Sequence, residues 1–260
     1  MAKWTAFPYD TDYSLSAAAL KMKWPRLHAG DAEPWPEDDK LLAAWALFHA
    51  GEFQKACEAG LMATSAGNPA GITVANKAQA VYANYLERSQ KAKLAMFLEV
   101  AARAAVQAAE DPRSASSHYW MAYALGRYSQ SISVATALAQ GLGSKVKTAL
   151  ETTLELAPHH ADAHVALGAF HAEVIDKVGR QLGRTQGADA ATGVKMFAQA
   201  LMLNPTSAIA MIEYANGLVM LEGDKRMQEV EGLYAQAAQS QAADAMERLD
   251  IEMAKAELAN

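Results

Sequence analysis

The chain has 260 residues, of which 52% are hydrophobic and 20% are charged, so it is long enough to bury a substantial core and too apolar to be disordered. Its formal net charge of -6, without any block of Lys or Arg, argues against nucleic acid as a partner, because phosphate binding requires a basic surface. Alanine, leucine and methionine dominate the apolar residues, which favours helices over strands.

The cysteine content and the hydropathy of the chain indicate in which cellular compartment the protein is expected. The single cysteine, Cys57, cannot form a disulfide within the chain and has no neighbouring zinc-site spacing, so we expect it to be a small core residue in a reducing environment. The first ten residues lack the apolar segment of a secretory signal. The longest uncharged stretch, 128–144, is too polar to span a membrane. We therefore expect a cytoplasmic protein without membrane insertion.

Residues 1–39 differ in composition from the rest of the chain. They contain four prolines and three tryptophans, which excludes one long helix because proline ends or kinks a helix. We expect an irregular N-terminal arm with a short helix around Leu15 to Met22, packed against the first helical hairpin or into a groove of the following domain. That domain, 40–260, is expected to consist of helical repeats.

Four prolines recur at similar intervals in this domain. Pro69, Pro112, Pro158 and Pro205 are separated by 43, 46 and 47 residues, and helical segments with apolar residues at three- and four-residue spacing lie between them. Each proline should end one helical hairpin, because it also disfavours helix at the residue before it. The spacing therefore predicts a repeat.

The residues around the last of these prolines resemble a known repeat. MFAQALMLNP resembles the end of a tetratricopeptide (TPR) repeat, with Phe197, Ala200 and Leu201 eight, five and four residues before Pro205. The resemblance implies an all-α, TPR-like α-solenoid of about four hairpins. Apolar residues in QAADAMERLDIEMAKAEL predict a C-terminal capping helix; they are Ala245, Leu249, Met253 and Ala256.

The stretch 117–221 more closely resembles the extended repeats of the regulator of microtubule dynamics family and its bacterial relatives. The similar segments are ALGRY at 124–128, HADAHVALGAFHAE at 160–173 and EYANGL at 213–218. The TPR period is about 34 residues, so longer helices or insertions must account for the longer period here. The alanine-rich composition is more similar to that of bacterial proteins, and the resemblance does not extend to a microtubule function.

Two glycine-containing stretches are expected to interrupt helices. QGLGSK at 140–145 follows a helix rather than a strand and lacks the spacer of a phosphate-binding loop, so it predicts a turn within a hairpin. The run QLGRTQGADA at 181–190 should break the long helix that starts near His159 and form a loop.

Three histidines are the candidate metal ligands. His160, His164 and His171 fall on one face of the expected helix, where imidazoles four residues apart can share a metal ion. However, residues 164 and 171 correspond to packing positions of the repeat, and two further ligands cannot be identified. Packing is the favoured interpretation, so we expect no metal and no cofactor. The acidic residues form no catalytic pattern, which argues against an enzyme.

The inner face of the stacked hairpins is the predicted binding surface, because such helices line a groove suited to a peptide or a small ligand. Mapping the repeat onto the chain places an apolar stripe with one cation on this face, and we expect Arg127 to meet an acidic group. The residues predicted to bind are Trp120, Tyr123, Arg127, Gln130, Glu173 and Asn216.

An alternative interpretation of the same helix is structural. Trp120 and Tyr123 could pack beneath a neighbouring helix while Arg127 pairs with an acid. Either way, the second stripe of the helix is expected in the core, and it consists of Met121, Leu125, Tyr128 and Ile132.

These features predict a non-catalytic scaffold that recognises a peptide or protein partner through its concave face. Two alternatives stay open. A closed, ligand-sized pocket would favour a small-solute-binding accessory protein of a transport system. An apolar ridge on the Met-rich last helices would favour a self-assembling structural homo-oligomer.

Overall fold

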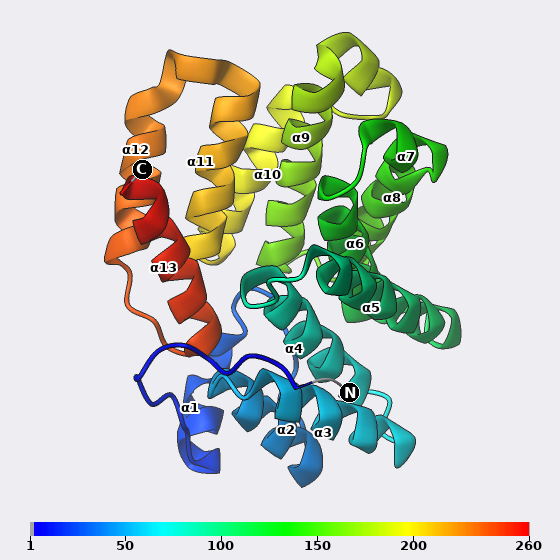
Figure 1. The fold of residues 1–260 in the computed structure, drawn as a ribbon, viewed down its shortest axis with the longest axis vertical. Coiled ribbons are helices and arrows are strands. Elements are labelled where there is room, and N and C mark those ends of the chain that lie inside the picture. Colours follow the sequence, from blue (N-terminus) through cyan, green and yellow to red (C-terminus); the bar gives the residue numbers. More distant parts are fainter. Residues whose placement is uncertain (1–2, 260) are drawn as a thin grey trace. The chain divides into compact units, whose positions relative to one another are not determined.

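The computed structural model describes residues 3–259, and all regular elements in this range are helical, as predicted. Thirteen α-helices and one 3-10 helix follow one another within it (Figure 1). The chain divides into two compact units. Unit 1 contains the residues up to His28, Glu33–Ser131 and Ala243–Met246, and unit 2 contains Ala29–Ala32, Ile132–Ala242 and the residues from Glu247 onward.

Unit 1 consists of six helices in which successive helices pack together from α2 to α6, and α4 also contacts α2 and α6. Its helices are α1 (Ala17–Leu27), α2 (Asp39–His49), α3 (Phe53–Ser65), α4 (Gly71–Tyr85), α5 (Gln90–Glu110) and α6 (Ala115–Gln130).

Unit 2 is built in the same way, with α9 packing against α8, α10 and α11, and α11 packing against α12. Its elements are α7 (Val134–Ala139), α8 (Leu142–Leu156), α9 (Ala161–Thr185), α10 (Ala190–Leu203), α11 (Ala208–Glu222), η1 (Gly223–Arg226), α12 (Met227–Gln239) and α13 (Ala245–Leu258), whose first two residues belong to unit 1.

The four recurring prolines all lie in loops between helices, as the spacing predicted. Pro69 and Pro112 precede α4 and α6, and Pro158 and Pro205 precede α9 and α11. The new helices begin at capping side chains. The hydroxyl of Ser114 accepts a hydrogen bond from the backbone N–H of Ser117 at 3.3 Å, and this N–H is one of those in the first turn that have no partner within the helix.

Glycine conformations set where two helices break. The expected loop at 181–190 is partly helical, because α9 continues to Thr185, and the break lies earlier, at Gly179. This residue has φ 79° and ψ 163°, a conformation that glycine adopts at little cost. Gly141, with φ 62°, separates α7 from α8. The turn predicted at 140–145 therefore consists only of its first residues.

The N-terminal arm packs on α3 and α4 through aromatic side chains. Its helix, α1, is longer than predicted and includes Pro25 in its last turn. Before that helix, the ring of Trp4 stacks on Tyr82 of α4 at a centroid distance of 4.3 Å. Phe7 contacts Phe53 of α3 edge to face at 6.5 Å. The arm is thus fixed to unit 1 at several points.

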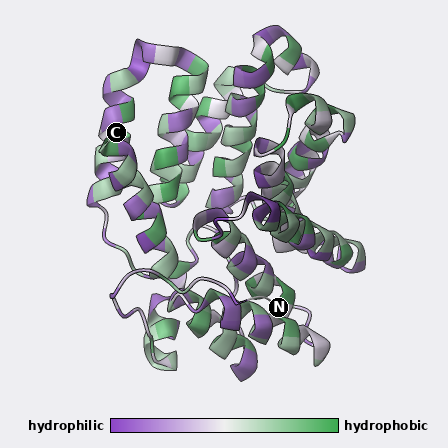
Figure 2. Cartoon of the chain, viewed as in Figure 1, coloured by the Kyte–Doolittle hydropathy of each residue, from purple (hydrophilic) through white to green (hydrophobic). Residues whose placement is uncertain are grey.

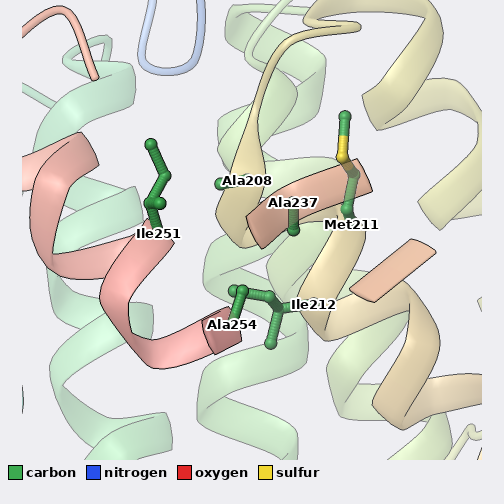
Figure 3. Close-up of a cluster of buried hydrophobic side chains, with 6 residues drawn as sticks. All are labelled: Ala208, Met211, Ile212, Ala237, Ile251 and Ala254. Carbon is green, nitrogen blue, oxygen red and sulfur yellow. The ribbon is translucent and has the colours of Figure 1, made fainter. Parts of the chain in front are cut away.

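The last helix, α13, packs on unit 2 through a cluster of buried apolar side chains (Figure 3). Ala256, expected in the apolar stripe, is exposed, and other residues of α13 are buried in its place. The cluster consists of Ala208, Met211, Ile212, Ala237, Ile251 and Ala254.

Hydrophobic and hydrophilic residues are mixed along the helices (Figure 2). Among residues 3–259, none of the helices combines the length and the apolar content needed to cross a membrane.

Candidate functional site

Helix α6 carries four of the six residues predicted to bind a partner. The helix packs against α4 and α5. Near its start, the hydroxyl oxygens of Ser116 and Thr73 of α4 are 3.1 Å apart and hydrogen bonded. This contact fixes the start of α6 against α4, and with it the orientation of the α6 side chains within unit 1.

An aromatic cluster forms the base of the predicted site. The rings of Tyr119 and Trp120 meet edge to face at a centroid distance of 5.0 Å, and Trp120 meets Tyr123 in the same way at 5.3 Å. Tyr119 and Trp120 are buried, whereas Tyr123 is half-buried. Trp120 is therefore a packing residue of α6, and Tyr123 is the aromatic residue of the predicted set that reaches the surface.

Arg127 lies on this aromatic base. Its guanidinium carbon is 5.3 Å from the centroid of the Tyr123 ring, within the range of a cation–π contact. Its Nη1 donates a hydrogen bond to Oε1 of Gln130 at 3.3 Å. Tyr123, Arg127 and Gln130 thus form a row in the last two turns of α6, which we call the α6 row.

The core face of α6 is not the one predicted. Met121, Leu125 and Tyr128, expected in the core, are only half-buried, and the fully buried positions include Ala122 and Ala124. Ala122 and Ala124 lie on nearly opposite sides of the helix, and their small side chains let neighbouring helices approach α6 closely on both sides. Tyr119 and Trp120 are buried as well, so no single stripe of large residues forms the core of this helix.

The other two predicted residues, Glu173 and Asn216, lie in unit 2 and do not belong to the α6 row. Glu173 of α9 forms an ion pair with Lys177 one turn later at 3.8 Å. The side-chain oxygen of Asn216 of α11 accepts a hydrogen bond from the hydroxyl of Tyr234. Both residues stabilise contacts within unit 2 in this structure.

The three histidines each make separate local contacts. His160 caps α9, since its Nδ1 accepts a hydrogen bond from the N–H of Ala163 at 3.1 Å. His164 Nε2 is hydrogen bonded to the carbonyl of Pro158 at 3.0 Å. Nδ1 of His171 accepts from the N–H of Asp189 at 3.1 Å. Within residues 3–259, no three His, Cys, Asp or Glu side chains are grouped so that they could hold a metal ion.

A partly buried polar network between α4 and α5 was not predicted. Arg103 of α5 donates hydrogen bonds to the side-chain oxygens of Asn76 at 2.9 Å and Gln79 at 2.7 Å. Gln79 in turn donates to Glu99 at 2.7 Å. Burial lowers the pKa of Arg103. A signal was present in the sequence, because Asn76 and Gln79 stand among alanines and, with Lys77, interrupt the apolar residues in the middle of α4.

A second buried cluster joins distant parts of the chain within unit 1. Nδ1 of His49 is 2.7 Å from Oδ2 of Asp244, and its Nε2 is 3.2 Å from Nε2 of His28. The ring of Trp24 stacks on His28 at 3.9 Å. A His–Asp pair is also a feature of general-base catalysis, but all three titratable side chains are buried. The cluster therefore stabilises the fold and offers no access to a substrate.

Comparisons with known proteins agree with the repeat architecture. Residues 47–177 match the family model described as regulator of microtubule dynamics protein 1-3. No curated protein is similar enough in sequence to count as a match. Among solved structures, a thermophilic TPR protein of Thermus thermophilus is similar with a TM-score of 0.60 and 16% identity, over 85% of this chain and 100% of that one. This similarity confirms the TPR-like fold.

Proposed function

Because the chain belongs to the regulator of microtubule dynamics protein 1-3 family and has a TPR-like fold, we propose that it is a non-catalytic scaffold that binds a protein or peptide partner. TPR-like helical pairs bind partners mainly through the inner faces of their helices. We assign the contact to the α6 row, which joins an aromatic ring, a cation and an amide within two turns of one helix.

The contact between Arg127 and Tyr123 carries this proposal. The guanidinium carbon of Arg127 is 5.3 Å from the centroid of the Tyr123 ring, and a guanidinium beside an aromatic ring is the kind of group that binds a carboxylate through two hydrogen bonds. The amide of Gln130, hydrogen bonded to Arg127 at 3.3 Å, can add a donor or an acceptor. The expected ligand is therefore an acidic side chain or the C-terminal carboxylate of a peptide.

The test compares variants in partner capture followed by titration. Partners are captured from a lysate of the native cell with the wild-type chain, identified, and reproduced as labelled peptides for fluorescence polarisation. Arg127→Ala should weaken peptide binding by about 10-fold or more, since a charge-assisted hydrogen bond contributes about 1.5–3 kcal/mol. Arg113→Ala, an exposed arginine in the loop before α6, is the matched control and should bind as the wild type does.

Circular dichroism must show equal helicity for all three proteins. Equal affinity of Arg127→Ala and the wild type for every captured peptide would contradict the assignment to the α6 row. If no protein partner is captured at all, the scaffold function itself is contradicted.

A further inference from the structure

Helix α5 exposes a continuous apolar face along most of its length. It is the longest helix of unit 1, with 21 residues, and packs against α4 and α6 (Figure 1). Its buried residues, Phe97, Val100, Ala101 and Ala104, lie on the opposite side of the helix. Leu98 and Val106 are 44% and 59% exposed, which is unusual for large apolar side chains that share one helix face. The exposed apolar residues, which we call the α5 face, are Ala95, Leu98, Ala102, Ala105, Val106 and Ala109.

The spacing of the α5 face fits a partner helix. Residues 95, 98, 102, 105 and 109 alternate between steps of three and four, which is the pattern of a helix–helix seam rather than of a solvated surface. Alanine at most of these positions allows the two backbones to approach closely. Only one charged residue, Glu99, lies among the exposed residues between 95 and 109, and it stands at the edge of the α5 face, where its carboxylate accepts a hydrogen bond from Gln79 of α4 at 2.7 Å.

The charges at the two ends of α5 are arranged against the helix dipole. Lys91 is exposed at the start of the helix, where positive charge is unfavourable, and the first turn contains no acidic residue. Glu110 is exposed at the end, next to Asp111, and the last turn contains no basic residue. An antiparallel copy of the same helix would bring each positive start beside a negative end.

From this arrangement we infer that the α5 face is a dimerisation surface whose partner is a second copy of this chain, with the two α5 helices antiparallel. A twofold axis near residue 100 pairs the apolar positions of one copy with those of the other. It also brings Lys91 of one copy close to Glu110 of the other. Such an isologous contact uses one self-complementary surface and closes at two subunits.

The dimer should be weak and reversible. An α-helix of this length is about 32 Å long, and one helix pair buries less area than the roughly 1,200–2,000 Å² of standard stable interfaces. We expect a dissociation constant in the micromolar range, so that dimer and monomer are both present at protein concentrations of about 10–100 μM.

Sedimentation equilibrium across this concentration range tests the surface. The wild type should form a dimer in a concentration-dependent way, and Leu98→Glu should remain a monomer, because it places a carboxylate in the apolar contact. Met62→Glu is the matched control, since Met62 of α3 is 72% exposed outside the α5 face, and it should dimerise as the wild type does. A wild type that stays monomeric throughout, or equal behaviour of the two variants, overturns the inference.

Charge exchange tests the antiparallel direction. Lys91→Glu should weaken the dimer by placing like charges side by side, and the double variant Lys91→Glu/Glu110→Lys should restore it. Chains carrying Ala95→Cys, mixed with chains carrying Ala105→Cys, should form a mixed disulfide on mild oxidation, because the axis places these two positions opposite each other, whereas Ser65→Cys, an exposed position on α3, should cross-link with neither. A double variant that dimerises no more tightly than Lys91→Glu, or cross-linking of each α5 variant with itself that equals the mixed cross-linking, would refute the antiparallel arrangement. Partner binding at the α6 row is measured separately, and its loss or retention leaves these outcomes unchanged.

Discussion

The fully buried ring of Phe197 in α10 packs directly against Gly217 of α11, so that a methyl group on this glycine would lie 2.8 Å from the ring carbon Cζ. Gly168 of α9 bounds the same ring from another helix, where a methyl group would lie 2.9 Å from Cδ1. Three helices of unit 2 therefore meet around one phenyl ring. The two glycines are required here for space rather than for backbone conformation.

Gly217→Ala should accordingly destabilise the protein although alanine is the better helix former. Inserting a methyl group into a packed core costs about 1–3 kcal/mol, and urea unfolding followed by circular dichroism measures the change. Gly232→Ala in α12 is the control, since nothing lies within 4 Å of the added carbon, and it should stabilise by about 0.5–1 kcal/mol. Two variants that shift stability in the same direction would contradict this packing.

Ile251→Ala should loosen the last helix from unit 2. Ile251 is 3% exposed in the cluster of Figure 3, and truncating a buried isoleucine costs about 2–5 kcal/mol. The thermal midpoint should fall by several degrees. Leu258→Ala, at a position that is 49% exposed near the end of α13, should change the free energy of unfolding by less than about 0.5 kcal/mol. A similar loss in both variants would mean that α13 is not held by this cluster.

Cys57 should be inert towards thiol reagents in the folded protein. Burial raises the pKa of its thiol to about 11, so the reactive thiolate is scarce at neutral pH. We expect slow labelling by a disulfide reagent in buffer and complete, rapid labelling in concentrated urea, followed by absorbance. Fast labelling of the folded protein would show that Cys57 is more accessible than its buried position on α3, with its Sγ near Gln79 of α4, implies.

His171 should make stability depend on pH. Burial, and then the charge of Lys147, lower the pKa of His171 below its ordinary value of 6.5, and its Nδ1 accepts a hydrogen bond only while unprotonated. The unfolded chain therefore binds this proton first as pH falls. The stabilising contribution is complete above 6.5 and is lost as pH falls through the lowered pKa.

The measurement is the free energy of unfolding at pH values from about 8 to about 5, for the wild type and His171→Gln. The wild type should lose more stability than the variant over this interval, because the variant lacks the titrating ring. Parallel curves for the two proteins would show that His171 does not titrate differently in the folded and unfolded states.

Local sequence patterns were enough to predict the helices. They were not enough to predict which face of a helix is buried, or which residues far apart in the sequence contact each other. Pro158 and Pro205 end helices through their own ring geometry, which needs no neighbour. Which face of α6 is buried depends on helices elsewhere in the chain, so the stripe containing Met121 and Leu125 was wrongly expected in the core. The pair His49 and Asp244 lies 195 residues apart, and no periodicity in the sequence connects them.

This pair also has a consequence for synthesis on the ribosome. Most helical repeats can fold one after another as they emerge, because each contacts only its neighbours. Here His49, buried in α2, meets its carboxylate only after 195 further residues have been made, which takes about 10–40 s at typical rates of elongation. Helix α2 therefore lacks this buried partner while those residues are being made, and a chain truncated before Asp244 lacks it permanently.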